Sequence, residues 1–146
     1  MDKLYIPGDL VMVKKSALQF AKDKIFKVIS SLSGGFVKVV ILNDGNTIYT
    51  ISNNVVRPIP LTPEILEKNR WDKEEKDGSV FSLSEAFMGG DENDEDNYTC
   101  FQLYYQNKKD GWVIDMRGEP LKFEIHYIHE LQHLFFGLGI NHEMEV

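Results

Sequence analysis

The residues best suited to chemistry form one run near the end of the chain, His129-Glu130-Leu131-Gln132-His133. Two histidines at positions i and i+4 of a helix lie one turn apart on one face, where both can bind a zinc ion. A glutamate directly after the first histidine can act as a general base on a metal-bound water. The spacing therefore raises the hypothesis of a minimal zinc-dependent hydrolase, with His129 and His133 as metal ligands and Glu130 as the catalytic base.

A catalytic zinc also needs a third protein ligand. One class of zinc proteases would place a histidine at position 139, where this chain has Gly139. The candidates that remain downstream are His142, Glu143 and Glu145, all close to the last residue of the sequence. Zinc is therefore the cofactor only under this alternative hypothesis, and otherwise we expect none.

The helix that must carry these histidines is predicted over residues 127–138, before Gly139. At about 100° per residue, an apolar stripe forms along one side of it. The stripe consists of Tyr127, Ile128, Leu131, Leu134, Phe135 and Leu138. His126, His129 and His133 fall on the opposite side, which is expected to face solvent, with Glu130 at the margin.

Residues 1–60 read as short strands separated by tight turns. The Asp44-Gly45 pair is typical of a tight hairpin, and Asn53-Asn54 suits a short helical turn. Pro58 and Pro60 confine the last strand to an edge. The predicted strands cover 10–14, 25–30, 36–42, 47–51 and 55–60. Five short strands hide their edges best by closing, so we expect an SH3-like β-barrel.

Residues 61–146 are expected to form a small α+β domain. Thr62 can cap a helix that begins at Pro63 and runs to about Arg70. Residues 72–97 are polar and are predicted to be irregular. Strands over 98–106, 112–116 and 121–125 then form a three-stranded antiparallel meander, which the C-terminal helix covers. The fold class is therefore mainly β, or α+β.

Charge differs between the two parts of the chain. The 146 residues carry a net charge of −7, with 42% hydrophobic residues, a composition typical of a globular protein. Residues 1–60 have a net charge of +4 and residues 61–146 a net charge of −11.

No apolar run approaches the roughly 20 residues that span a bilayer, and no secretory signal is evident. We expect a cytoplasmic protein without a membrane partner, and we expect the single cysteine, Cys100, to be a small core residue.

Several side chains are candidates for binding. The basic candidates for nucleic-acid contact are Lys14, Lys15, Lys24, Lys27 and Lys38, for which ordinary surface solubility is the competing explanation. The aromatic residues available for a ligand-binding cage in the barrel are Tyr5, Phe20, Phe26, Phe36 and Tyr49, although such residues more often form the core. The acidic run at 91–96 lacks the spacing of a calcium loop and is expected to be a solvated loop.

Two resemblances add to these expectations. Residues 8–11 and 56–59 are similar to segments of SH3-like barrels of the Tudor or KOW kind. Residues 57–64 and 128–138 resemble a family of small uncharacterised proteins of Bacteroidetes-type bacteria and their phages and prophages. Relatives in that family commonly carry other residues where this chain has His133 and Glu130. The resemblance therefore implies that the zinc-protease pattern at 129–133 is coincidental.

The function favoured by the sequence is a non-enzymatic binding or adaptor protein of phage or mobile-element origin, with protein or nucleic acid as its partner. A zinc hydrolase is the first alternative. A structural or virion-associated subunit is the second, which would be a homo-oligomer with Phe135 or Phe136 at its interface.

Overall fold

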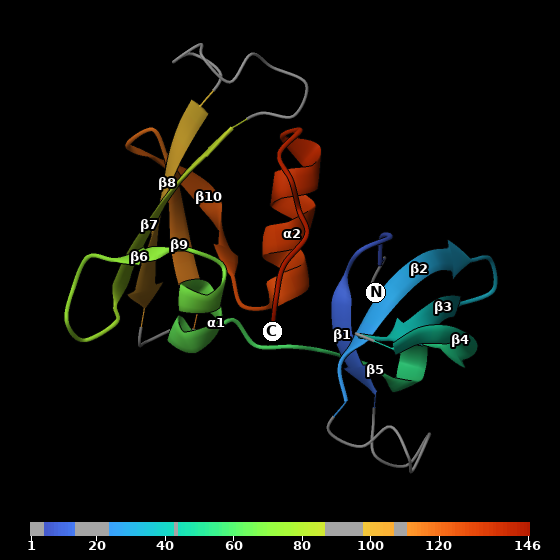
Figure 1. Cartoon of the computed structure of the whole chain (residues 1–146). Coiled ribbons are helices and arrows are strands. Elements are labelled where there is room, and N and C mark those ends of the chain that lie inside the picture. Colours follow the sequence, from blue (N-terminus) through green and yellow to red (C-terminus); the bar gives the residue numbers. More distant parts are fainter. Residues whose placement is uncertain (1–4, 14–23, 43, 87–97, 107–110) are drawn as a thin grey trace. The chain divides into compact units, whose positions relative to one another are not determined.

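The computed structural model describes residues 5–13, 24–42, 44–86, 98–106 and 111–146 (Figure 1). The chain divides into two compact units, Met1–Ile59 and Pro60–Val146. The sequence places the same boundary one residue later, after Pro60. Each unit contains one antiparallel five-stranded sheet, so the protein is mainly β with few helices.

The first unit is a single antiparallel sheet with the strand order β4-β3-β2-β1-β5. Its strands are β1 (Leu10–Val13), β2 (Phe26–Leu32), β3 (Phe36–Ile41), β4 (Asp44–Ser52) and β5 (Val56–Pro58). Alternate residues of β2 and β3 are buried, as a sheet with one core face requires. The core consists of Tyr5, Val11, Val13, Phe26, Val28, Val37, Val39, Ile51 and Val56.

The turns of this unit follow local chemistry. A 3-10 helix, η2 (Asn53–Val55), separates β4 from β5, and the Ser52 side chain accepts a hydrogen bond from the Asn54 amide. Strand β5 lies at the edge of the sheet, as its proline predicted. Strand β4 begins earlier than expected, because Asp44 pairs with Ile41 instead of forming the turn. Among the described strands no pairing joins β4 to β5, so the sheet is not closed.

The second unit has a larger sheet than the sequence predicted. Its strands are β6 (Asp72–Lys73), β7 (Val80–Ala86), β8 (Tyr98–Gln106), β9 (Gly111–Met116) and β10 (Glu119–Ile125), in the order β10-β9-β8-β7-β6. The predicted three-stranded meander is present as β8, β9 and β10. The prediction of an irregular segment over 72–97 was wrong where β6 and β7 occur, and residues 87–97 lie outside the described residues. Strand β7 pairs with β8 along its whole length and places Phe81, which is fully buried, opposite Leu103.

Two helices complete this unit. Helix α1 (Pro63–Lys68) begins as predicted, because the Thr62 hydroxyl accepts a hydrogen bond from the Ile65 amide at 3.3 Å. Helix α2 (Ile128–Gly137) lies beside the sheet (Figure 1). Its Phe135 ring packs 5.0 Å from Phe101 of β8 and stacks on Trp71, which follows α1. The rings of α2 therefore join the sheet and α1 in one core.

Within the described residues, neither helix has the length and apolar character needed to cross a membrane.

Replacing Phe81 by alanine tests the additional strand. The ring is fully buried against the sheet, so Phe81→Ala should lower the free energy of unfolding by about 3–5 kcal/mol. Both tryptophans, Trp71 and Trp112, belong to this unit, so denaturant unfolding followed by tryptophan fluorescence reports on it directly. Phe123→Ala is the matched control, because Phe123 lies in the same sheet with 46% of its surface exposed. Equal losses in the two variants would contradict the assignment of β7 to the core.

Candidate functional site

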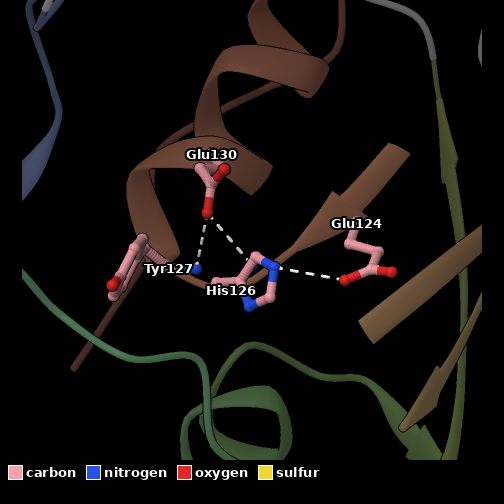
Figure 2. A network of polar contacts seen from close by, with 4 residues as sticks. All are labelled: Glu124, His126, Tyr127 and Glu130. Atoms are coloured by element: carbon pink, nitrogen blue, oxygen red, sulfur yellow. Dashed lines mark hydrogen bonds and ion pairs between the residues drawn. The ribbon is translucent and has the colours of Figure 1, made fainter. Parts of the chain in front are cut away.

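Glu130, the candidate catalytic base, is engaged at the start of α2 (Figure 2). Its Oε1 atom accepts hydrogen bonds from the backbone amides of His126 at 3.0 Å and Tyr127 at 2.9 Å. The first amides of a helix have no partner within the helix, and a glutamate at the third helical position commonly satisfies one of them. The Glu130 carboxylate therefore has a structural role. A glutamate at the third position of a helix is also the sequence pattern typical of such a cap.

The same cap fixes the position of the His126 ring. Its Nε2 atom lies 3.3 Å from Glu124 Oε2, and the imidazole is partly exposed (Figure 2). The ring also packs against the backbone of Gly111, where an added Cβ would lie 2.5 Å from the imidazole Cε1. Only glycine at position 111 leaves room for the imidazole in this place.

The other histidines do not share one solvent-exposed face. His129 retains only 7% exposure, and its ring stacks on Tyr127 with 5.9 Å between centroids. The predicted solvent-facing side of the helix was therefore wrong for His129. His133 is partly exposed and meets the His129 ring edge-on at 5.4 Å.

The polar side of α2 is covered because the chain returns along it after the helix. Gln132 is fully buried, and its amide nitrogen donates a hydrogen bond to the His142 carbonyl at 3.0 Å. Further along the tail, Glu145 exchanges two backbone hydrogen bonds with the Asn69 side chain, each 2.8 Å long. A helical wheel alone does not include this returning segment.

The structure does not assemble a complete metal site in the part of the chain that it describes. No three His, Cys, Asp or Glu side chains there lie close enough to hold one ion. The His142 ring packs edge-on against Phe136 at 5.2 Å. His129 and His133 are neighbours, but a catalytic zinc requires a third ligand. None of the described residues supplies that ligand beside them.

The lysines named as candidates for nucleic-acid contact are spread over the first unit. Lys24 and Lys38 are exposed and Lys27 is partly exposed, whereas Lys14 and Lys15 lie outside the described residues. Lys27 of β2 and Lys38 of β3 alternate with buried residues, so both lie on the outer face of the sheet.

The aromatic candidates of the first unit that the structure describes do not form a cage. Tyr5 and Phe26 are core residues, and Tyr49 packs edge-on against Phe26 at 6.4 Å. Phe36 is 46% exposed, and Phe20 lies outside the described residues.

Two further expectations concern the second unit. Cys100 was expected in the core but is exposed, because it occupies the outer side of β8, where its Sγ atom lies 3.7 Å from Ser84 Oγ. The acidic run at 91–96 lies outside the described residues.

The second unit contains a pocket of about 780 Å³ that the sequence did not reveal. Its volume lies in the range of small-molecule and side-chain binding sites. Five separate segments form its wall, and they contribute Pro60, Leu61, Thr62, Pro63, Asp77, Gly78, Ser79, Tyr105, Trp112, His126 and Tyr127. We refer to it as the aromatic pocket, because Tyr105, Trp112 and Tyr127 belong to its lining.

Hydrogen bonds hold the first segment of this wall in place. The buried indole of Trp112 donates its N–H to the Leu61 carbonyl at 3.2 Å. The Leu61 amide in turn donates to the His126 carbonyl at 3.0 Å, and Pro60 forms an isolated β-bridge with Tyr127. The segment that precedes α1 is thus fixed against both the sheet and the start of α2.

A tight turn forms the opposite part of the wall. Asp77 Oδ1 accepts hydrogen bonds from the Ser79 amide at 2.9 Å and from the Ser79 hydroxyl at 2.6 Å. These bonds, with the hydroxyl making the larger contribution, lower the pKa of the exposed Asp77 carboxyl. Gly78 has a φ of +76° and packs beside Pro63, while the Tyr105 amide donates to the Ser79 carbonyl.

The lining has a defined chemical character. It combines aromatic rings with one carboxylate, Asp77, which is ionised at neutral pH as an ordinary aspartate is, and whose pKa the Ser79 hydrogen bonds lower further. No lysine or arginine occurs among the described lining residues. Aromatic faces and a carboxylate bind ligands by stacking, by cation–π attraction and by charge-assisted hydrogen bonds. The arrangement suits recognition of such ligands.

A second, more open pocket of about 350 Å³ lies over the motif itself. Its lining consists of Phe123, Ile125, Glu130, His133 and Leu134. Only two of these side chains carry acid–base chemistry, and Glu130 is the helix cap described above.

Comparison of the chain with models of protein families, with curated proteins and with solved structures gives no match.

Two substitutions of Glu130 separate its structural role from a catalytic one. Glu130→Ala removes the acceptor of two backbone amides and should lower the free energy of unfolding by about 0.5–2 kcal/mol. Glu130→Gln keeps an acceptor oxygen and should retain most of that stability. Denaturant titrations of both variants, with Glu143→Ala in the exposed tail as the control, measure the difference.

If the motif binds a metal, zinc content and stability should give another outcome. Zinc bound by untagged wild-type protein and lost in His133→Ala, together with full stability of Glu130→Ala, would contradict the capping role.

Proposed function

We propose that this protein is a non-enzymatic binding or adaptor protein whose second unit holds a segment of a partner protein in the aromatic pocket. The observation that carries the proposal is the construction of the pocket. Five segments of the chain meet there, and hydrogen bonds of Leu61, Ser79, His126 and Tyr127 hold them in place. A wall fixed in this way needs little ordering when a ligand binds, which favours affinity.

The geometry gives less support to a hydrolase. Glu130 is occupied with two backbone amides, and the described residues bring no third metal ligand to His129 and His133. A base that activates water must reach that water, whereas this carboxylate faces the helix start.

We also propose an SH3-like barrel for the first unit. The strand order β4-β3-β2-β1-β5 and the short 3-10 helix before β5 support this class, and the resemblance of residues 8–11 and 56–59 agrees with it. The phage or mobile-element origin rests on the resemblance of the whole chain to the family of small proteins named above.

Selection from a random peptide-display library tests the proposed function. The intact protein should enrich peptides that bind in a saturable way. Tyr105→Ala, which shortens a partly exposed wall residue, should weaken their binding at least about tenfold, because aromatic contact residues commonly dominate such sites. Tyr98→Ala is the control, since Tyr98 lies on the same strand but does not line the pocket. Failure to enrich peptides, or equal binding by Tyr105→Ala, would reject the aromatic pocket as the binding site.

Nucleic-acid binding by the first unit is a second candidate, because Lys27 and Lys38 share the outer face of its sheet. If it occurs, duplex DNA should be retarded at low salt. The double variant Lys27→Ala/Lys38→Ala should then reduce the slope of log affinity against log salt by roughly 1 to 2. Lys68→Ala/Lys76→Ala, in exposed positions of the other unit, provides the control of equal charge. An absence of retardation at low salt would remove this candidate.

A further inference from the structure

We propose that the aromatic pocket recognises a cationic side chain of the partner segment, and that arginine is its preferred residue. This inference rests on the proposed function, since it names the chemistry that the same pocket selects.

The aromatic rings of the pocket are arranged in two inclined pairs. Tyr105 and Trp112 lie 5.2 Å apart between centroids with their planes at 57°. His126 and Tyr127 lie 6.2 Å apart at 49°. Tyr105, which is 36% exposed, offers ring surface to a ligand. A cation within about 6 Å of a ring centroid is attracted by the negative charge of the ring face.

Trp112 restricts the chemistry that the pocket offers. An indole has one hydrogen-bond donor, its N–H, and here that donor is bound to the Leu61 carbonyl. Trp112 is only 2% exposed, so it contributes to the pocket as the apolar ring against which Tyr105 packs. It gives no hydrogen-bond donor to an anion.

Charge favours a cation over the other ligands that stack on aromatic rings. Asp77 is exposed, and its carboxylate is held by the Ser79 turn at the pocket wall. A second carboxylate, Glu124, is close to the lining, with 3.3 Å between its Oε2 atom and His126 Nε2. With no lysine or arginine among the described lining residues, an anionic ligand would meet net repulsion.

Two features favour arginine over lysine. A guanidinium is planar, so it can stack on an aromatic ring while its N–H groups bind a carboxylate. A carboxylate offers about four acceptor positions, and Ser79 occupies two of those on Asp77. Both bonds go to Oδ1, so Oδ2 keeps its two acceptor positions for guanidinium N–H groups.

A paired peptide array tests the inference with the full-length protein. Each random sequence is synthesised twice, once with arginine at its centre and once with citrulline, which has nearly the same shape but no charge. For sequences that bind the pocket, the arginine member should bind about tenfold more tightly, as expected for charge-assisted hydrogen bonds. Asp77→Asn should reduce the arginine preference about fivefold while keeping the acceptor for the Ser79 turn.

The control for charge is Asp115→Asn. Asp115 lies on the sheet face opposite to the buried Ile114, and it does not line the pocket. This variant should leave the arginine preference unchanged.

The outcomes separate the inference from the proposed function. Equal binding of the arginine and citrulline members, with both lost in Tyr105→Ala, would overturn the cationic preference and leave the peptide-binding role standing. A stronger signal for citrulline, or an arginine preference unaffected by Asp77→Asn, would also overturn it. If no peptide of either kind binds in a manner that depends on Tyr105, both proposals fail.

Discussion

The second unit depends on the hydrogen bond from the buried Trp112 indole to the Leu61 carbonyl. A buried indole N–H without a partner would cost about 1–3 kcal/mol, so the indole and the segment at 60–63 stabilise each other's position. Leu61 is also tied to the His126 carbonyl, which links the sheet, the entry to α1 and the start of α2 at one residue. The aromatic pocket lies at this junction, and Leu61, Trp112 and His126 are among its lining residues.

The run at 129–133 shows how one residue pattern serves two different purposes. A glutamate at the third position of a helix and a glutamate after a zinc-binding histidine occupy the same place in the sequence, so the pattern does not distinguish them. In this protein the Glu130 carboxylate turns back to the amides of His126 and Tyr127. It thereby orders the backbone of two residues that line the pocket.

Local chemistry explains which elements the sequence predicted. The alternation in β2, β3 and β8, the Thr62–Pro63 helix start and the apolar stripe of α2 were all evident, because each depends on neighbours in the chain. Strand β7 was missed although Phe81 and Leu83 alternate with serines, since the polar residues around it suggested a loop. The burial of His129 and the aromatic pocket were missed for a different reason. The pocket depends on segments that meet only in the folded chain, such as the turn at 77–79, and a helical wheel takes no account of the contacts that bury His129 in the folded chain.

The proposed function requires that the aromatic pocket bind a segment of a partner protein. Chemical-shift mapping of the isotope-labelled full-length protein, titrated with an arginine-centred peptide from the array, tests it most directly. The account predicts that the largest shifts fall on the Trp112 indole N–H and on the backbone amides of Ser79, Tyr105, His126 and Tyr127. The chemical shifts of the Ser84 and Cys100 backbone amides should remain unchanged, because the side chains of these residues lie on the outer face of the sheet. Shifts concentrated in residues 24–58, or around His129 and His133 alone, would contradict the account.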